Sequence, residues 1–183
     1  MRELVERAKA GDREAFSELG RLWVDRLYAI ACLILRDPER ATDATQEALI
    51  ACWRDLRGLR DPDRFEPWIR RILVHACYRE ARRTRTRYQH EHRVALLDIG
   101  EPDLATAVAD RDELERGFLL LAPDQRALIA LHFYVGLPLQ DTADALGLPL
   151  GTVKSRLHRT VQELRANLAA EARVPNLPEG RPA

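Results

Sequence analysis

Polar side chains suited to contacts with nucleic-acid bases and phosphates recur at helical spacing between residues 149 and 165. Counting 100° per residue places Val153 and Leu157 on an apolar stripe, which Val161 and Leu164 continue. The opposite face carries hydroxyl, guanidinium and amide groups, which can read duplex DNA when a helix enters the major groove. The residues expected to make such contacts are Thr152, Ser155, Arg159 and Gln162, with Arg156 on the flank.

The residues before this stretch fit the first half of a helix-turn-helix. Residues 141–146 predict a short helix, in which Ala143 is small enough for two helices to cross closely. Gly147 supplies a turn residue that adopts a positive φ without strain. A plain helical hairpin with a solvated polar face fits the same spacing. Spacing alone therefore leaves DNA binding and a structural hairpin both open.

A block of arginines precedes a block of acidic residues in the middle of the sequence. The formal net charge is zero, with 29 basic and 29 acidic residues, so the segregation of charge matters more than its total. Residues 70–93 hold eight arginines against Glu80 and Glu91, and residues 98–115 hold seven acidic residues against Arg111. The blocks indicate two different partner surfaces. Arginine suits bidentate phosphate and guanine contacts, although a GC-rich genome explains the same bias.

Histidine and cysteine residues offer little for an enzyme. His75 and Cys77 are two residues apart on a predicted helix and therefore point to different sides. His90 and His92 have no further ligands at useful spacing, and a catalytic zinc needs three protein ligands. The sequence has no glycine-rich phosphate loop and no GxSxG or HExxH motif. We therefore expect no enzyme activity, no metal and no cofactor, and buried free thiols at Cys32, Cys52 and Cys77.

Four amphipathic helices are expected to position the arginine block. The first breaks at Gly11, and Asp12 caps a second helix that ends before Pro38. A third runs from about residue 39 to residue 56, and a fourth begins near Phe65. Short connections make these four helices a compact bundle. The apolar stripe of the fourth helix is Phe65, Trp68, Ile69, Ile72, Leu73 and Ala76.

The rest of the chain divides into a linker, a second helical domain and a tail. Periodicity weakens after residue 84, and later helices end at Pro123, Gly136 and Gly147. The expected fold class is all-α: a domain at 1–85, an acidic linker at 86–112, a second domain at 113–170 and a disordered tail at 171–183. No apolar run approaches the ~20 residues that span a bilayer, and the N-terminus is not a signal peptide. We therefore expect a cytoplasmic protein without membrane insertion.

The second domain resembles a known family. Residues 121–136, residues 143–147 and above all Gly151-Thr-Val-Lys-Ser-Arg-Leu-His-Arg159 closely resemble the promoter-binding domain of extracytoplasmic-function (ECF, group IV) RNA polymerase sigma factors. The resemblance implies a region 4 helix-turn-helix domain that recognises the −35 promoter element. Pro138, Leu139 and Gln140 depart from the family's pattern, which bears on promoter specificity and leaves the fold intact. The implied −35 contacts are Thr152, Lys154, Ser155, Arg156 and Arg159.

A segment of the first domain resembles the part of the same family that binds the coiled coil of the polymerase β′ clamp. It reads Asp43-Ala-Thr-Gln-Glu47 and is followed by Trp53-Arg54. Carboxylate and amide groups on one side of a rigid helix suit a basic partner helix. Taken alone, the stretch is better explained as a solvated helix face. The implied core-polymerase contacts are Asp43, Gln46, Glu47 and Trp53.

The fourth helix resembles the family's −10 recognition helix through Phe65-x-x-Trp68-Ile69-x-x-Ile72 and the arginines that follow. Promoter opening needs a basic track and a way to hold unstacked bases. The resemblance implies that the loop at 57–64 caps a flipped base. Phe65 and Trp68 are expected in the core, and Tyr78 is the candidate for an exposed ring. The implied −10 contacts are Arg60, Arg64, Arg71, His75, Tyr78, Arg79, Arg82 and Arg83.

Two departures accompany this likeness, because His75 and Arg79 stand where the family commonly has Asn and Asp. They imply an unusual −10 preference or a different anchoring of the helix.

Across residues 12–168 the resemblance implies a sigma factor whose partners are core RNA polymerase (β′ clamp and β flap), promoter DNA and an anti-sigma factor. The acidic linker would mimic RNA in a basic channel, and a solubilising tether explains it equally. A stand-alone DNA-binding regulator is the alternative, but it leaves residues 43–47 and 70–87 without a purpose.

Overall fold

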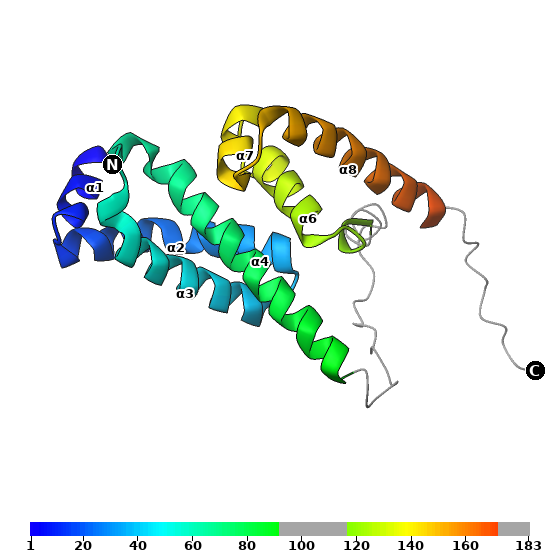
Figure 1. Cartoon of the computed structure of the whole chain (residues 1–183), viewed down its shortest axis with the longest axis horizontal. Coiled ribbons are helices and arrows are strands. Elements are labelled where there is room, and N and C mark those ends of the chain that lie inside the picture. The colour runs from blue at the N-terminus through cyan, green and yellow to red at the C-terminus, as the bar shows by residue number, and fades with distance from the viewer. Residues whose placement is uncertain (92–116, 172–183) are drawn as a thin grey trace, which may run out of the picture.

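The computed structural model describes residues 1–91 and 117–171, and every regular element in those ranges is helical. The first range holds α1 (Arg2–Lys9), α2 (Arg13–Leu35), α3 (Pro38–Asp55), the short turns η1 (Leu56–Gly58) and η2 (Pro62–Arg64), and α4 (Phe65–Glu91). The second holds α6 (Pro123–Ile129), η3 (Ala130–Tyr134), α7 (Leu139–Leu146) and α8 (Leu150–Glu171), as Figure 1 shows. The predicted all-α fold class is confirmed.

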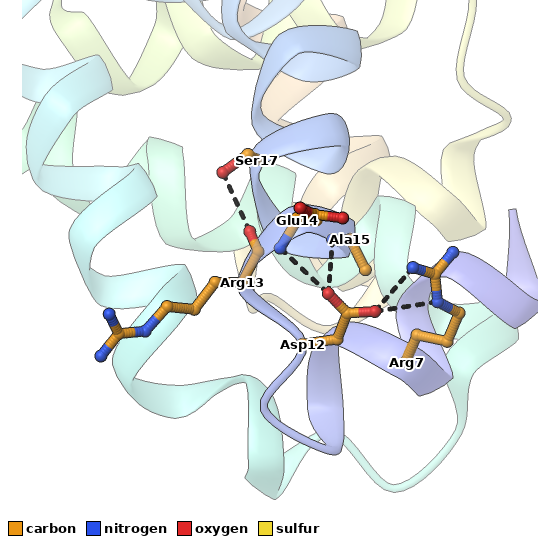
Figure 2. A network of polar contacts seen from close by, with 6 residues as sticks. All are labelled: Arg7, Asp12, Arg13, Glu14, Ala15 and Ser17. Carbon is orange, nitrogen blue, oxygen red and sulfur yellow. Dashed lines mark hydrogen bonds and ion pairs between the residues drawn. The ribbon is translucent and has the colours of Figure 1, made fainter.

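Asp12 fixes the start of α2, as the sequence predicts. Its Oδ1 accepts hydrogen bonds from the backbone N–H groups of Glu14 and Ala15, both at 3.0 Å. Its Oδ2 accepts from the Arg7 guanidinium at 2.6 and 2.9 Å (Figure 2). The Ala15 N–H and the Arg7 hydrogen bond hold the pKa of Asp12 below its ordinary value. Because Arg7 belongs to α1, one carboxylate caps α2 and ties α1 to it.

The core of the first bundle lies among α2, α3 and α4. Trp23 of α2 meets Phe65 of α4 edge to face, with ring centroids 6.0 Å apart and each residue only 1% exposed. The side of α3 that faces them is small and buried, with Ala41, Ala44 and Ala48 in a row, so the helices approach closely. The predicted four-helix arrangement is therefore present, with α3 capped by Asp37 and opened by a proline.

The apolar stripe of α4 is shorter than the helix itself. Phe65, Ile69, Leu73 and Ala76 are buried as expected, while Trp68 and Ile72 are half-buried against the core. The helix nevertheless continues to Glu91, past the boundary expected at residue 85. A helix without an apolar face still forms where arginine and glutamate have good helix propensity, so the end of a stripe does not mark the end of a helix. The remaining linker, including Asp98, Asp103 and Asp110, and the tail at 172–183 lie outside the described residues.

The C-terminal helices end near the predicted breaks, but one of them changes from α-helical to π-helical geometry before it ends. The stretch expected to be helical from Asp124 to Val135 is α-helical to Ile129 and then widens into the π-helical turn η3. The Val135 N–H donates to the Ala130 carbonyl five residues earlier, at 2.9 Å. A π-turn accommodates one extra residue, which an apolar period does not reveal. It leaves Phe133 and Tyr134 exposed in succession.

The two expected domains touch one another through a continuous apolar core. Buried residues of α2 and α4 belong to the same cluster as Leu128 of α6, Leu146 of α7 and Val153 of α8. α7 lies against α4, and α6 lies against both α2 and α4, on one side of the first bundle (Figure 1). Within residues 1–91 and 117–171, no helix is both long and apolar enough to cross a membrane.

The three cysteines are free thiols in unequal surroundings. Cys52 and Cys77 are buried, and burial is the first cause that raises the pKa of each thiol to about 12. Cys32 is only half-buried, so the expectation of full burial is wrong there, because its side of α2 lies at the edge of the core. Among the described residues, no three His, Cys, Asp or Glu side chains gather closely enough to hold a metal ion.

Candidate nucleic-acid interface

The polar face of α8 lies at the surface, where the sequence places it. Lys154, Ser155 and Arg159 are exposed, and Thr152 and Arg156 are half-buried. On the inner side Val153 is fully buried, and the rest of the predicted stripe is half-buried: Leu157, Val161 and Leu164. Thr160 is also buried. The spacing of apolar residues does not predict this, because threonine is not counted among them. Thr152, Ser155, Arg156 and Arg159 therefore share one accessible side of α8, while Lys154, also exposed, lies further round the helix.

Only weak contacts hold the two arginines of this face. Arg159 Nε donates to the Ser155 carbonyl at 3.4 Å, and Arg156 pairs with Asp124 of α6 at 3.4 Å. Both lie beside a cleft of about 450 Å³ between α6 and α8. Because exposed ion pairs of this kind contribute little, either guanidinium can exchange its contact for a phosphate or a base edge at small cost.

Gly147 makes the turn that directs α8. Its φ of +67° lies in the left-handed region, and the N–H of Leu148 donates to the Ala143 carbonyl at 3.0 Å to close the end of α7. Ala143 is buried where α7 meets its neighbours. The Thr142 hydroxyl donates to the Pro138 carbonyl at 3.0 Å within the first turn of α7. The predicted helix-turn-helix is confirmed in its helices and its turn.

A second polar row lies along α4, formed by Arg71, His75 and Arg79 at four-residue spacing, each exposed. Although His75 is exposed, its partial desolvation lowers its pKa, and the positive charges of Arg71 and Arg79 lower it further. This shift favours the neutral imidazole, which offers one donor and one acceptor. Arg82 and Arg83 extend the exposed basic side, with Arg83 3.3 Å from Glu80.

The loop before α4 presents Arg60 and Arg64, both exposed. Asp61 accepts from the Asp63 N–H at 3.0 Å and starts the turn η2. Arg64 does not project freely from it, because its Nη2 donates to Asp144 of α7 at 2.6 Å. Phe65 is buried, and Trp68 is half-buried with its ring centroid 6.1 Å from that of Phe65, which agrees with their assignment to the core.

The expectation of an exposed ring at Tyr78 is wrong. The side chain is half-buried against the core, and burial, followed by the charge of Asp124, raises its pKa, while Arg156 opposes the shift. Asp124 and Arg156 belong to α6 and α8, so helices from the other end of the chain cover this part of α4. The sequence of α4 alone cannot show such a long-range contact.

The polar side of α3 carries the residues predicted to bind core polymerase. Asp43 and Gln46 are exposed, while Glu47 is half-buried and accepts from Arg79 of α4 at 3.1 Å. Arg79 is one of the two departures from the family pattern, and this bond gives it an anchoring role that the sequence left open. The structure thus joins a predicted polymerase contact to a predicted −10 contact.

An apolar patch lies beside that polar side. Trp53 is 42% exposed, and its ring packs against Phe16 of α2 with centroids 4.7 Å apart. Ile50, at 66% exposed, lines the same shallow cleft of about 480 Å³. Sequence reasoning missed Ile50. The sequence could have indicated it, because Ile50 lies three residues before Trp53 and therefore on the same side of α3, away from the buried alanines.

Comparisons with known proteins agree with this division of the chain. The family description "Sigma-70 region 2" matches residues 21–87, which span most of α2, all of α3 and most of α4. The description "Sigma-70, region 4" matches residues 119–166, which contain the helix-turn-helix. The residues predicted for −10 contacts therefore fall within the first matched region, and those predicted for −35 contacts fall within the second.

Individual relatives extend the likeness over most of the chain. ECF RNA polymerase sigma factor SigM of Mycobacterium tuberculosis is 34% identical over 169 residues, covering 91% of this chain and 82% of that protein. CnrH, solved in complex with the cytosolic domain of CnrY, shares 26% identity with a TM-score of 0.66, covering 93% of this chain and 97% of that one. The sigma factor RpoE of Bartonella quintana, solved with the anti-sigma factor NepR, has the same fold, with 23% identity, a TM-score of 0.66 and coverage of 85% and 98%. The chain therefore belongs to the extracytoplasmic-function (ECF) RNA polymerase sigma factors.

Proposed function

We propose that this sigma factor, of group IV, binds core RNA polymerase and directs initiation by reading the −35 element with α8 and the −10 element with α4. The observation that carries the proposal is the pairing, in one chain, of an exposed helix-turn-helix face with a second helix lined by arginines. Promoter-specific initiation needs a duplex reader and a basic track for a separated strand, and the two helices supply one each.

At the −35 element, Arg156 and Arg159 suit guanine or phosphate, Thr152 and Ser155 flank them on the same side, and exposed Lys154 lies further round the helix. At the −10 element, Arg71, Arg79, Arg82 and Arg83 attract the displaced strand, and neutral His75 contributes hydrogen bonds. Arg60 and Arg64 lie beside that track, at the loop proposed to hold a flipped base. Tyr78 joins these contacts only after the helices that cover it move away.

The partner surfaces follow the same division. Asp43, Gln46, Glu47 and Trp53 on α3 are proposed to meet the β′ clamp, where carboxylates face a basic helix and the indole supplies apolar area. The C-terminal domain is proposed to meet the β flap. An anti-sigma factor is a further proposed partner, as RpoE of Bartonella quintana has in NepR. The protein acts in the cytoplasm as a regulatory initiation factor, not as a classical enzyme.

Run-off transcription tests the proposal. Core polymerase is incubated with fragmented DNA of the source genome, with and without this protein, and the 5′ ends of the transcripts are sequenced. We expect new transcripts whose start sites share paired upstream elements. Absence of new transcripts, together with no co-elution of the protein with core polymerase, would contradict the proposal and leave a stand-alone DNA-binding protein.

A further inference from the structure

The loop proposed to hold a flipped −10 base, residues 57–64, has buried anchors on both sides of its exposed part. Leu59 and Pro62 are buried, whereas Arg60 between them is exposed. The short turns η1 and η2 lie on either side, and each is closed by a backbone hydrogen bond, of 3.1 and 3.0 Å respectively. Because these anchors and turns leave the backbone few alternatives, the directions of the Arg60 and Arg64 side chains depend on where η1 and η2 are held.

α1 contacts both turns of this loop, at the end of the bundle where α4 begins (Figure 1). At η2, Arg2 Nη1 donates to Asp63 Oδ2 at 2.5 Å. Near η1, the Arg57 guanidinium lies beside the turn that follows α1, so that a Cβ at Gly11 would be 3.5 Å from Arg57 Nη2. On its inner side α1 is fixed to the core of the first bundle by Val5, which is fully buried. α1 therefore supports the loop at two points.

The Arg2 side chain is held between α1 and the loop by two carboxylates. Its Nε donates to Glu6 Oε1, one turn further along α1, at 3.1 Å. The charge of Asp63, followed by the hydrogen bond to Glu6, raises the pKa of Arg2. Arg2 and Asp63 also line the same cleft, of about 380 Å³, as Arg64. Because Arg64 follows Asp63 directly in the chain, a shift of Asp63 moves Arg64 as well.

The Arg2–Asp63 ion pair matters more for DNA recognition than for stability. Both side chains are 59% exposed, and exposed ion pairs contribute little to the free energy of unfolding. An unpaired carboxylate at Asp63 would, by contrast, repel the phosphates of a bound strand. Arg2 offsets that negative charge and holds η2 in one position. Loss of the pair should therefore change how the loop selects a base while the bundle stays folded.

We infer that α1 supports the base-holding loop and that Arg2 is a positioning residue: through Asp63 it fixes η2 and so sets the preference for one base at the flipped position of the −10 element. This role rests on the proposed function of the loop. The ligand whose recognition it adjusts is one unpaired base together with its neighbouring phosphate. Arg2 thus belongs to the −10 recognition machinery although it lies 61 positions before its partner in the chain.

Charge reversal tests this role in the complete holoenzyme. Run-off transcription is measured on templates that carry each of the four bases at each position of the mapped −10 element. Arg2→Glu places a carboxylate against Asp63 and is expected to lower the preference for the favoured base about five-fold at one position, with the −35 preference retained. Adding Asp63→Arg to this variant restores an ion pair of reversed sense and should recover most of the preference.

Arg21→Glu makes the same charge change at an exposed position of α2 and is the matched control. We expect it to keep the full base preference. An unchanged preference in Arg2→Glu, an equal change in Arg21→Glu or no recovery in the double variant would overturn the inference.

Amide hydrogen exchange of the free protein gives a second readout that needs no promoter. Peptides covering residues 57–64 should exchange faster in Arg2→Glu and at the wild-type rate in Arg2→Lys, which keeps the cation, while peptides from the middle of α2 stay unchanged. Faster exchange throughout the bundle would overturn the positioning role. Absence of promoter-specific transcripts with the wild-type protein would contradict the proposed function itself. Normal promoter-specific transcripts with an unaltered base preference in Arg2→Glu would contradict only the role of α1.

Discussion

The two helices proposed to read DNA differ in what lies on their outer faces. α8 presents Lys154, Ser155 and Arg159 to solvent, and the hydrogen bond of Arg159 and the ion pair of Arg156 stay within the C-terminal domain. α4 is engaged from two directions, by Glu47 of α3 through Arg79 and by the turn at Gly147 through Arg71. The difference shows that periodicity identifies which side chains lie on the polar face of a helix. Whether those side chains are accessible to a ligand depends on which other parts of the chain pack over them.

The largest expected effect comes from Glu47→Lys, which changes the α3 residue that contacts α4. The substitution reverses a charge proposed to meet the β′ clamp and also removes the partner of Arg79. We expect loss of co-elution with core polymerase on gel filtration, with the helical circular dichroism spectrum retained. Glu39→Lys, an exposed change in the first turn of the same helix, should leave co-elution intact. Retained binding by the Glu47 variant would remove this residue from the interface.

Phe65→Ala tests whether the two regions share a core. Removing a fully buried aromatic ring that contacts Trp23 should lower the free energy of unfolding by about 3–5 kcal/mol. Because buried residues of both domains form one cluster, we expect one cooperative transition in urea, shifted as a whole. Fluorescence and circular dichroism should report the same midpoint. Two separate transitions in the wild-type protein would show that the domains unfold independently.

Arg159→Ala tests the exposed face of α8. Loss of one base contact should weaken binding to duplex −35 DNA by ~1–3 kcal/mol, measured with holoenzyme on fragments that differ only in that element. Binding to the −10 single strand and the melting temperature should not change, because Arg159 is exposed and its described hydrogen bond is to the Ser155 carbonyl of its own helix. Arg165→Ala, exposed on the same helix, is the matched control. An equal loss on every sequence would assign Arg159 to phosphate.

The smallest expected effect concerns Asp12, which lies away from both reading faces. Its pKa is lower in the folded protein than in the unfolded chain, so its contribution is complete above the unfolded pKa of about 3.9 and disappears as the pH falls through the folded value. Asp12→Asn keeps an acceptor for the Glu14 and Ala15 N–H groups and should flatten this acid loss of melting temperature. Asp12→Ala should lower the melting temperature at neutral pH as well. Identical acid profiles for wild type and Asp12→Asn would contradict the assignment.

Features set by neighbouring residues could be predicted from the sequence. Asp12 caps α2, Gly147 turns between α7 and α8, and the polar side of α8 lies outward, because each depends on a few adjacent positions. The cover over Tyr78, the Arg64–Asp144 pair and the Glu47–Arg79 bond depend on residues far apart in the chain. The π-turn η3 and the length of α4 also escaped prediction, since neither changes the apolar pattern used to place helices.

The buried thiols have a consequence for chemical reactivity. With their pKa values raised to about 12, Cys52 and Cys77 are protonated thiols at neutral pH. Thiolate is the form that peroxides and alkylating reagents attack, so these two sulfur atoms react slowly for as long as the bundle stays folded. Modification of Cys52 or Cys77, located by peptide mapping so that half-buried Cys32 is counted separately, therefore reports how often the bundle opens.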